Sequence, residues 1–284
     1  MSSYVAGSKR KRTKRAIVQY SLLVLLSITT LLPLIWMLST SLKSGDVIFE
    51  IPPKFLPDGF HWENYSRAVS EIEFATLFKN SLTITFFNLL SNVFVSALVA
   101  YGFARFQFPG KSIWFLLVLS TIMLPGEVTM IPVFIGFSKI GWTNTFKPLI
   151  IPGFLGGAPV FIFLLRQFFM SIPKELDESA VLDGASSFKI FYRIFLPLSI
   201  PALVTIGIFS FQGSWNDLLG PLIYLNDTNK FTLPLGLAMF QGVMKVEWGP
   251  LMAGSILVLL PVLVIFFLAQ KQFVEGVKLS GIKG

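Results

Sequence analysis

The sequence has no cysteine and a single histidine, His61. Without cysteine the chain cannot form a disulfide, a thiolate zinc site, an iron–sulfur cluster or a cysteine nucleophile. One histidine also excludes a histidine-rich metal site. Charge is scarce as well, since 13% of the residues are charged and 54% are hydrophobic, whereas soluble domains are about 25% charged. The composition therefore argues against a soluble globular enzyme.

Long stretches without a charge mark the candidate membrane helices, because a helix that crosses about 30 Å of hydrocarbon needs about 20 residues. Four stretches are long enough outright, and two more are marginal because a charge interrupts or closes them early. We accept all six, with expected spans at residues 16–40, 81–104, 113–136, 148–168, 198–225 and 249–270. The sequence thus predicts an all-α membrane protein: a basic N-terminus (1–15), a six-helix transmembrane domain (16–272) and a C-terminal tail (273–284).

The 23 lysine and arginine residues divide unequally between the two sides of these spans. With the N-terminus inside, 15 fall on the cytoplasmic side and eight outside, so the positive-inside rule predicts that both termini are cytoplasmic. The first stretch is too long for a signal-peptide core and has no cleavage site, so we expect a retained anchor. We interpret the basic run at residues 9–15 as an orienting flank on anionic lipid, not as a nucleic-acid-binding tail.

The most informative segment runs from Ser171 to Pro197, on the predicted cytoplasmic side. Pro173 suits a first helical position, and the acidic residues that follow it favour the positive end of a helix dipole. These signals predict a short helix from Pro173 to Asp183, stopped by Gly184, with Ser186 or Ser187 capping a second helix. Two readings remain open for the first helix: a contact that receives force from another protein, or an interfacial amphipathic helix.

The sequence ESAVLDGA from Glu178 to Ala185, followed by the FLP that ends at Pro197, resembles the EAA signature of permease subunits in bacterial ABC importers. Ser179 stands where the signature usually has alanine. Three further stretches extend the resemblance over nearly the whole chain: residues 52–65, 214–222 and 270–284. Together they are similar to the carbohydrate-uptake family, in particular to the smaller permease subunit of maltose-type importers.

The resemblance implies a type I ABC importer permease fold in a bacterial cytoplasmic membrane. It implies that a cytoplasmic coupling helix docks on an ATPase through Glu178, Ser179, Ala180, Asp183, Gly184 and Ala185. The partners it implies are a second permease, two ATPase subunits and an extracytoplasmic sugar-binding protein. It also implies that the tail contacts the ATPase through Ser280, Gly281 and Gly284. We call residues 171–197 the coupling segment.

The resemblance further implies that this chain is not an enzyme and binds no cofactor itself, since ATP and Mg would be used by the partner ATPase subunits. The residues agree, because the one candidate for a phosphate-binding loop is incomplete. Gly110, Lys111 and Ser112 match the end of such a loop, but Arg105 stands where its first glycine belongs.

Two acids lie within or at the ends of the expected spans, Glu127 and Asp217, where an ionisable group is costly unless it faces protein or water. Both are candidates for a solute pathway. Trp215 and Asn216 precede Asp217 and add an aromatic face and an amide, a combination suited to a sugar. The alternative is that these three residues contact a partner permease or cap a helix break. Asn88 and Asn92 share a helix face and are expected to hydrogen-bond another helix.

Two other classes of function are alternatives to the importer permease. A proton-coupled secondary transporter would use Glu127 or Asp217 as its proton site, although the sequence shows no internal repeat. An intramembrane enzyme would need a converging nucleophile and base, and no motif for one is present. The motifs favour the permease subunit of an ATP-driven importer of sugars, most readily oligosaccharides.

Overall fold

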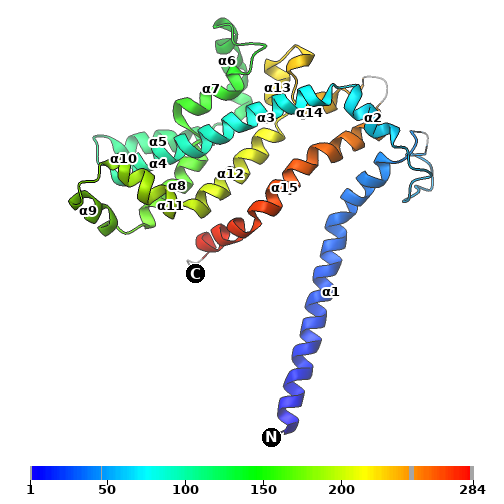
Figure 1. The fold of residues 1–284 in the computed structure, drawn as a ribbon, viewed down its shortest axis with the longest axis horizontal. Helices are drawn as coiled ribbons and strands as arrows, with labels where there is room; N and C mark the ends of the chain where they lie inside the picture. Colours follow the sequence, from blue (N-terminus) through cyan, green and yellow to red (C-terminus); the bar gives the residue numbers. More distant parts are fainter. Residues whose placement is uncertain (1, 46, 243–245, 282–284) are drawn as a thin grey trace. The chain divides into compact units, whose positions relative to one another are not determined.

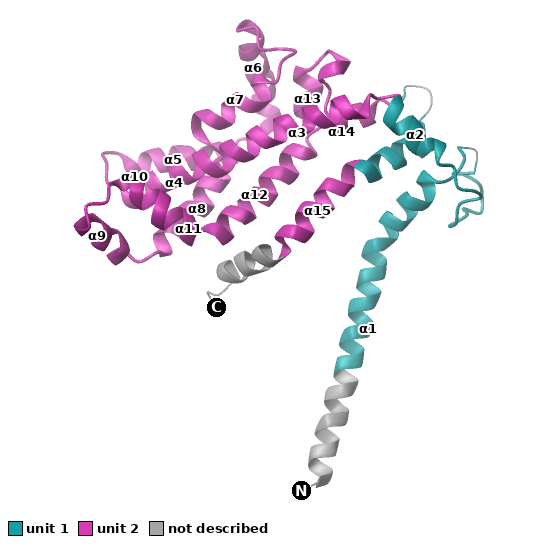
Figure 2. Ribbon diagram, in the orientation of Figure 1, with its two compact units in different colours: residues 1–70, 240–257 teal, residues 71–239, 258–284 magenta. Residues whose placement is uncertain are grey.

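The computed structural model describes residues 2–45, 47–242 and 246–281, with side chains in 16–45, 47–242 and 246–270. These residues are almost entirely helical, and the only β pairing among them is an isolated bridge between Gln241 and Val246. This confirms the all-α class. The chain divides into two compact units, which are coloured separately in Figure 2: residues 1–70 with 240–257, and residues 71–239 with 258–284.

Unit 1 contains α1 (Ser2–Ser41), α2 (Glu63–Ser70) and the first turns of α15 (Trp248–Gly281). The side chains of α1 between residues 17 and 34 are exposed around the whole helix, although they are mostly leucine, isoleucine and valine. A helix that is apolar on every side is stable in lipid or against a partner, not in water. Its apolar part, Ala16–Ser41, is long enough to cross a membrane and matches the first predicted span.

The end of α1 is fastened to the following loop and to α2. Lys43 is 1% exposed; its Nζ donates to the carbonyl oxygen of Lys54 at 2.6 Å and lies over the ring of Trp36. Burial lowers the pKa of Lys43, against the attraction of Asp58. Asn64 of α2 donates to the carbonyls of Ser41 and Lys43. These bonds satisfy backbone groups that the end of a helix leaves without partners.

Unit 2 contains the remaining helices and most of the length of α15. Their bounds are α3 (Phe74–Leu90), η1 (Ser91–Val95), α4 (Ser96–Arg105), α5 (Lys111–Ser120), η2 (Thr121–Met123), α6 (Gly126–Lys139), α7 (Lys147–Gly156), α8 (Pro159–Ser171), α9 (Glu175–Leu182), α10 (Ser187–Ile190), η3 (Phe191–Phe195), α11 (Leu196–Leu198), α12 (Ile200–Trp215), α13 (Leu219–Tyr224), η4 (Thr228–Lys230) and α14 (Leu233–Ala238). Within this unit α4 packs against α8, and α3 packs against α12 (Figure 1). The elements η1 and η3 are π-helical turns.

Four helical stretches in the described residues are long and apolar enough to cross a membrane, and the number rises to six if each of two bent pairs is one span. The four are Ala16–Ser41, Phe74–Arg105, Lys147–Ser171 and Trp248–Gln270. The bent pairs are Lys111–Met123 with Gly126–Lys139, at 101°, and Ser187–Leu198 with Ile200–Trp215, at 79°. The structure therefore agrees with between four and six spans.

The boundaries of two predicted spans differ from the observed helices. The second helical stretch begins at Phe74, not at residue 81, because Lys79 ends an uncharged run without ending a helix. The fifth was expected as one span over residues 198–225. Instead the helix begins at Ser187, bends near Ser199 and ends at Trp215. Prolines on both sides of this bend remove backbone donors, which explains why the helix does not run straight.

The core of unit 2 lies where small and aromatic side chains alternate between α4 and α8. Ala97 and Ala100 of α4 are completely buried, which lets α8 approach closely. Phe169 of α8 and Phe195 of η3 each meet the ring of Tyr101 edge to face. This packing joins the ends of three helical stretches beside the coupling segment.

Two hydrogen-bonded rungs connect α3 and η1 to α12. The amide of Asn88 donates to the hydroxyl of Ser214 at 3.0 Å, and the amide of Asn92 donates to the hydroxyl of Ser210 at 2.9 Å. Both asparagines therefore hydrogen-bond another helix, as their spacing predicted. A pair of such bonds fixes the register between two apolar helices.

Candidate functional site

The coupling segment forms the short helix that the sequence predicts. This helix, α9, runs from Glu175 to Leu182, with three acidic residues in its first turn. Beyond it Gly184 has φ +71°. The amide of Gly184 donates to the carbonyl of Val181, and the amide of Ala185 donates to that of Ala180. This pair of bonds is a Schellman motif, so Gly184 is the left-handed residue that stops the helix.

The six predicted coupling residues divide between an exposed face and a packed base. Glu178, Ser179, Asp183 and Gly184 are exposed. Ala180 is buried in the core cluster of unit 2, and Ala185 packs against that cluster. Small side chains thus lie at the base of the helix, whereas Glu178 of its first turn and its stop at Gly184 are exposed.

The apolar residues of α9 do not form a single buried face. Only Ala180 is buried, whereas Val181 is 60% exposed and Leu182 is 88% exposed. Phe188 and Tyr192, which follow in α10 and η3, are also exposed. Exposed apolar side chains gathered beside one helix mark a contact surface for another molecule. The sequence analysis missed Leu182, although it lies inside the motif.

The second helix of the coupling segment begins where a cap was predicted. Ser186 is the residue before α10, and its hydroxyl accepts a hydrogen bond from the amide of Lys189 at 3.4 Å. Of the two serines proposed as the cap, the structure selects Ser186. The chain then continues through η3 and α11 into α12.

The base of α9 is held by an ion pair that the sequence analysis did not find. Nε of Arg105, at the end of α4, lies 3.2 Å from Oδ2 of Asp177 in the first turn of α9. The guanidinium also donates to the carbonyl of Ile172 at 2.6 Å. Burial raises the pKa of Asp177, and the positive charge of Arg105 opposes that rise. No local pattern could have joined two residues that are so far apart in the sequence.

The candidate pathway residues have three different environments. Trp215 is 1% exposed; its indole N–H donates to the carbonyl of Val258, and its ring contacts Phe78 and Phe211. In this conformation the ring therefore packs inside the protein. Asn216 is exposed, and its amide donates to the carbonyl of Gln212.

Asp217 caps the helix that follows it. Its Oδ1 accepts a hydrogen bond from the amide of Gly220 at 3.0 Å, in the first turn of α13. This is the helix-break role that the sequence analysis kept as an alternative. Glu127 is exposed in the first turn of α6, immediately after the 101° bend. Within the described part of the chain no hydrogen bond or ion pair joins Glu127 to Asn216 or Asp217.

The predicted tail contact falls largely outside what the structure describes. The backbone of Ser280 and Gly281 belongs to α15, and their side chains are not described. Gly284 lies outside the described residues. The role of these three residues stays a prediction.

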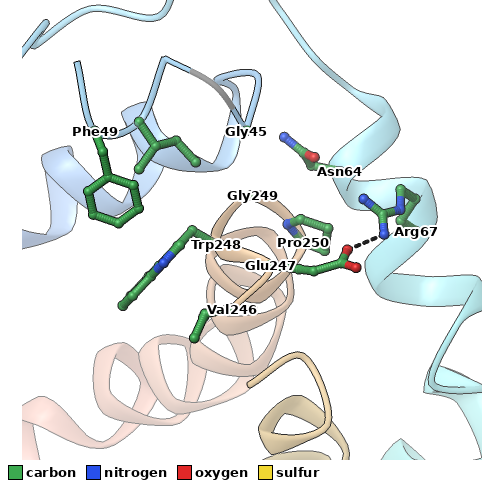
Figure 3. A pocket seen from close by; sticks show the side chains of 10 residues that line it. Gly45, Phe49, Asn64, Arg67, Val246, Glu247, Trp248, Gly249 and Pro250 are labelled. Atoms are coloured by element: carbon green, nitrogen blue, oxygen red, sulfur yellow. Dashed lines mark hydrogen bonds and ion pairs between the residues drawn. The ribbon is translucent and has the colours of Figure 1, made fainter. Parts of the chain in front are cut away.

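Unit 1 contains a cavity of about 440 Å³ that the sequence analysis did not anticipate. Figure 3 shows its lining, in which Arg67 of α2 pairs with Glu247 just before α15. The rings of Trp248 and Phe49 meet edge to face at 5.8 Å on the same lining. A Cβ at Gly249 would lie 2.7 Å from the amide of Asn64, so only glycine permits this approach. The lining of the cavity thus combines aromatic rings with one ion pair.

Comparison with known proteins identifies what this arrangement belongs to. A family model described as "Binding-protein-dependent transport system inner membrane component" matches residues 1–278. The probable ABC transporter permease protein YurM of Bacillus subtilis is 39% identical over 252 residues, which cover 89% of this chain and 83% of that protein. The trehalose/maltose transport system permease protein MalG of Thermococcus litoralis is 33% identical over 265 residues, covering 92% of this chain and 94% of its own.

A solved structure agrees with these sequence relatives. One chain of a bacterial ABC transporter involved in the import of the acidic polysaccharide alginate superposes with a TM-score of 0.76 and 25% identity. The match covers 91% of this chain and 96% of that chain. The resemblance inferred from the coupling segment and the type I permease fold are both confirmed. The chain therefore belongs to the binding-protein-dependent transport system inner membrane component family and is a multi-pass membrane protein with the fold of an ABC importer permease.

Proposed function

We propose that this chain is one of two permease subunits in an ATP-driven, binding-protein-dependent importer of oligosaccharides. The observation that carries the proposal is α9, which ends in a glycine stop and exposes Val181 and Leu182 beside its acidic first turn. A rigid helix with apolar side chains in solvent is suited to a cleft on another protein. Glu178, Ser179, Asp183 and Gly184 form the rest of the docking face, with Ala180 and Ala185 beneath it.

The proposed assembly has a second permease, two cytoplasmic ATPase subunits and an extracytoplasmic sugar-binding protein. Both termini are cytoplasmic, and the tail at Ser280, Gly281 and Gly284 reaches the ATPase. ATP and Mg are used by the ATPase subunits, so this chain binds no cofactor and catalyses no reaction. Support for a binding-protein partner comes from a second solved structure, in which an alginate ABC transporter is in complex with an alginate pentasaccharide-bound periplasmic protein.

The substrate class rests on the relatives. Several are named for oligosaccharides or disaccharides, including the arabinooligosaccharides transport system permease protein AraQ of Bacillus subtilis, which is 34% identical over 273 residues. Within this chain we assign Glu127, Asn216 and Asp217 to the solute path. Trp215 is buried in the observed conformation, with its ring against Phe78 and Phe211.

A purification from the native membrane tests the proposal. The tagged chain is isolated, its partners are identified, and ATP hydrolysis is measured with candidate sugars and their binding protein. We expect to recover a second permease and an ATPase. Its ATP hydrolysis should be stimulated by one binding protein when that protein carries its sugar. A chain that purifies alone and transports sugar in liposomes without ATP would overturn the importer and favour a proton-coupled secondary transporter, with Glu127 and Asp217 as the leading proton sites.

A pair of matched variants tests the docking face. Leu182→Glu places a charge on the most exposed apolar side chain of α9 and is expected to abolish recovery of the ATPase. The control is Ile51→Glu, at a leucine-sized side chain that is 95% exposed in a loop of unit 1. Both variants should insert in the membrane equally. Normal recovery of the ATPase with Leu182→Glu would contradict docking through α9.

A further inference from the structure

The last turn of α4 holds both ends of the loop that contains α9. Arg105 contacts the entry to the loop, because its guanidinium donates to the carbonyl of Ile172 and pairs with Asp177. Tyr101 contacts the exit, because its hydroxyl donates to the carbonyl of Ser187 at 3.2 Å. Tyr101 and Arg105 are four residues apart and therefore lie on one face of the helix. One turn of a membrane helix thus reaches both sides of the coupling helix.

The guanidinium of Arg105 also connects α9 to η3, near the end of the coupling segment. It lies over the ring of Phe195, with Cζ 4.7 Å from the ring centroid. Only 7% of the Arg105 side chain and 22% of the Asp177 side chain are exposed. At such low exposure opposite charges attract strongly, and removing one of them leaves the other buried without compensation.

Little else fastens α9 to the rest of unit 2. Of its apolar residues only Ala180 is buried, and a single methyl group gives little packing. Leu176, Val181 and Leu182 are all exposed. The ion pair and its backbone contacts are therefore the main physical connection between α9 and the helices that cross the membrane.

Arg166 provides a comparison for Arg105, because its guanidinium also contacts a backbone carbonyl and an aromatic ring of neighbouring helices. It lies on α8, donates to the carbonyl of Phe103 and stacks over the ring of Phe115. These contacts parallel the backbone bond and the ring contact of Arg105. Within the described residues Arg166 has no carboxylate partner, and no hydrogen bond joins its guanidinium to the coupling segment. The carboxylate from α9 is what distinguishes Arg105.

We propose that Arg105 and Asp177 are positioning residues that fix the coupling helix to α4, so that a displacement of α9 moves the membrane helices instead of bending the loop. The inference rests on the proposed function, since it takes α9 to be the helix that meets the ATPase. Tyr101 completes the attachment at the exit. Because α4 continues through η1 into α3, and α3 bonds to α12, the displacement is passed to two neighbouring membrane helices.

The test measures coupling, not activity alone. The complete importer is reconstituted, and sugar uptake is divided by ATP hydrolysed. Asp177→Asn and Arg105→Gln are expected to recover the ATPase normally but to lower uptake per ATP by about tenfold, within the range of coupling energies between protein sites. Asp177→Glu keeps the charge and should retain more coupling than Asp177→Asn. Tyr101→Phe loses one neutral hydrogen bond and should lower the ratio by about two- to threefold.

The matched control is Arg166→Gln, which removes a guanidinium of similar surroundings. Its uptake per ATP should equal that of the wild type. A role in folding alone would lower the amount of assembled importer for Arg105→Gln without changing uptake per ATP in what assembles.

The absence of cysteine permits a direct measurement of the attachment in the same complex. Cysteines introduced at two exposed positions outside the proposed docking face, Glu175 of α9 and Gln167 of α8, carry a pair of spin labels. We expect one narrow distance distribution in the wild type and with Arg166→Gln, and a broad one with Asp177→Asn. An equally narrow distribution with Asp177→Asn would overturn the proposal.

The outcomes separate this inference from the proposed function. If the wild-type chain recruits no ATPase, both fall together. If the wild type couples and Asp177→Asn and Arg105→Gln couple equally well, only the positioning role is overturned. If Arg166→Gln loses as much coupling as Arg105→Gln, the effect belongs to any guanidinium at this depth, and the assignment to Arg105 and Asp177 is wrong.

Discussion

Two apolar helical stretches of this chain have opposite relations to the rest of the protein. In α1 none of the side chains in the most apolar stretch is buried, whereas 28% of the corresponding stretch of Phe74–Arg105 is buried. Both are hydrophobic enough to cross a membrane. The difference lies in the small and polar residues of Phe74–Arg105, which permit close packing and interhelical hydrogen bonds. Hydropathy identifies a membrane helix, but the small residues reveal which helices pack within the chain.

The largest contrast is expected from truncating one large side chain on each kind of helix. Phe169→Ala removes a ring that is completely buried against α4 and η3 and should lower the free energy of unfolding by about 3 kcal/mol or more. Leu25→Ala removes a side chain of α1 that is 60% exposed and should change little. Thermal unfolding of the two purified variants measures the difference. Equal losses would show that α1 is packed as tightly as the core.

A smaller contrast is expected between two glycines. Gly157 has φ +72°, and a Cβ there would lie 2.6 Å from the hydroxyl oxygen of Ser96 on α4. Gly157→Ala should therefore destabilise the protein by about 1 to 3 kcal/mol, from backbone strain and overpacking. Gly136 lies within α6 with open space around it. Gly136→Ala should therefore raise the free energy of unfolding by about 0.5 to 1 kcal/mol. The melting temperatures of the two variants, each compared with the wild type, check that one is destabilised and the other stabilised. A Gly157→Ala variant as stable as the wild type would contradict the close approach of Gly157 to Ser96.

The smallest effect is expected at the two asparagine–serine hydrogen bonds between neighbouring helices. Asn92→Ala and Ser210→Ala each remove one side of a single hydrogen bond. A double-mutant cycle should give a coupling energy of about 0.6 kcal/mol, as is typical within membrane proteins. The same cycle for Asn92 with Ser214, which bonds to Asn88 instead, provides the control and should give almost none.

The sequence predicted the coupling helix well because every signal for it is local. Pro173, the acidic first turn and Gly184 act within a few residues, and the structure places the helix start and stop within two residues of the expectation. The angles and directions of the two bends were not predicted, because counting charge-free residues measures apolar length and says nothing about direction. A proline near a span end is compatible with either a straight or a broken helix.

Side-chain direction and tertiary packing, which the sequence does not show directly, decide the surroundings of the remaining site residues. Trp215, Asn216 and Asp217 are adjacent in sequence, yet the first is buried, the second is exposed and the third caps a helix. Neighbours on a helix point in different directions, so adjacency does not place them in one site. Arg105 and Asp177 meet only in the folded chain, which brings the end of α4 next to the start of α9.

The π-helical turn η1 lies in the middle of the continuous helix formed by α3 and α4. It sets the rotation about the helix axis between the side chains that face α12 and those that face α8. Before it, Asn88 faces α12; after it, Ala97 and Ala100 face α8. A π-turn contains one residue more than an α-turn, and one residue corresponds to a rotation of about 100°. Deleting a single residue between Ser91 and Val95 would therefore turn Ala97, Tyr101 and Arg105 away from their partners, although none of these three residues is itself changed. The alignment of the coupling helix with the rest of unit 2 thus depends on one inserted residue, which lies about ten positions before Arg105 in the sequence.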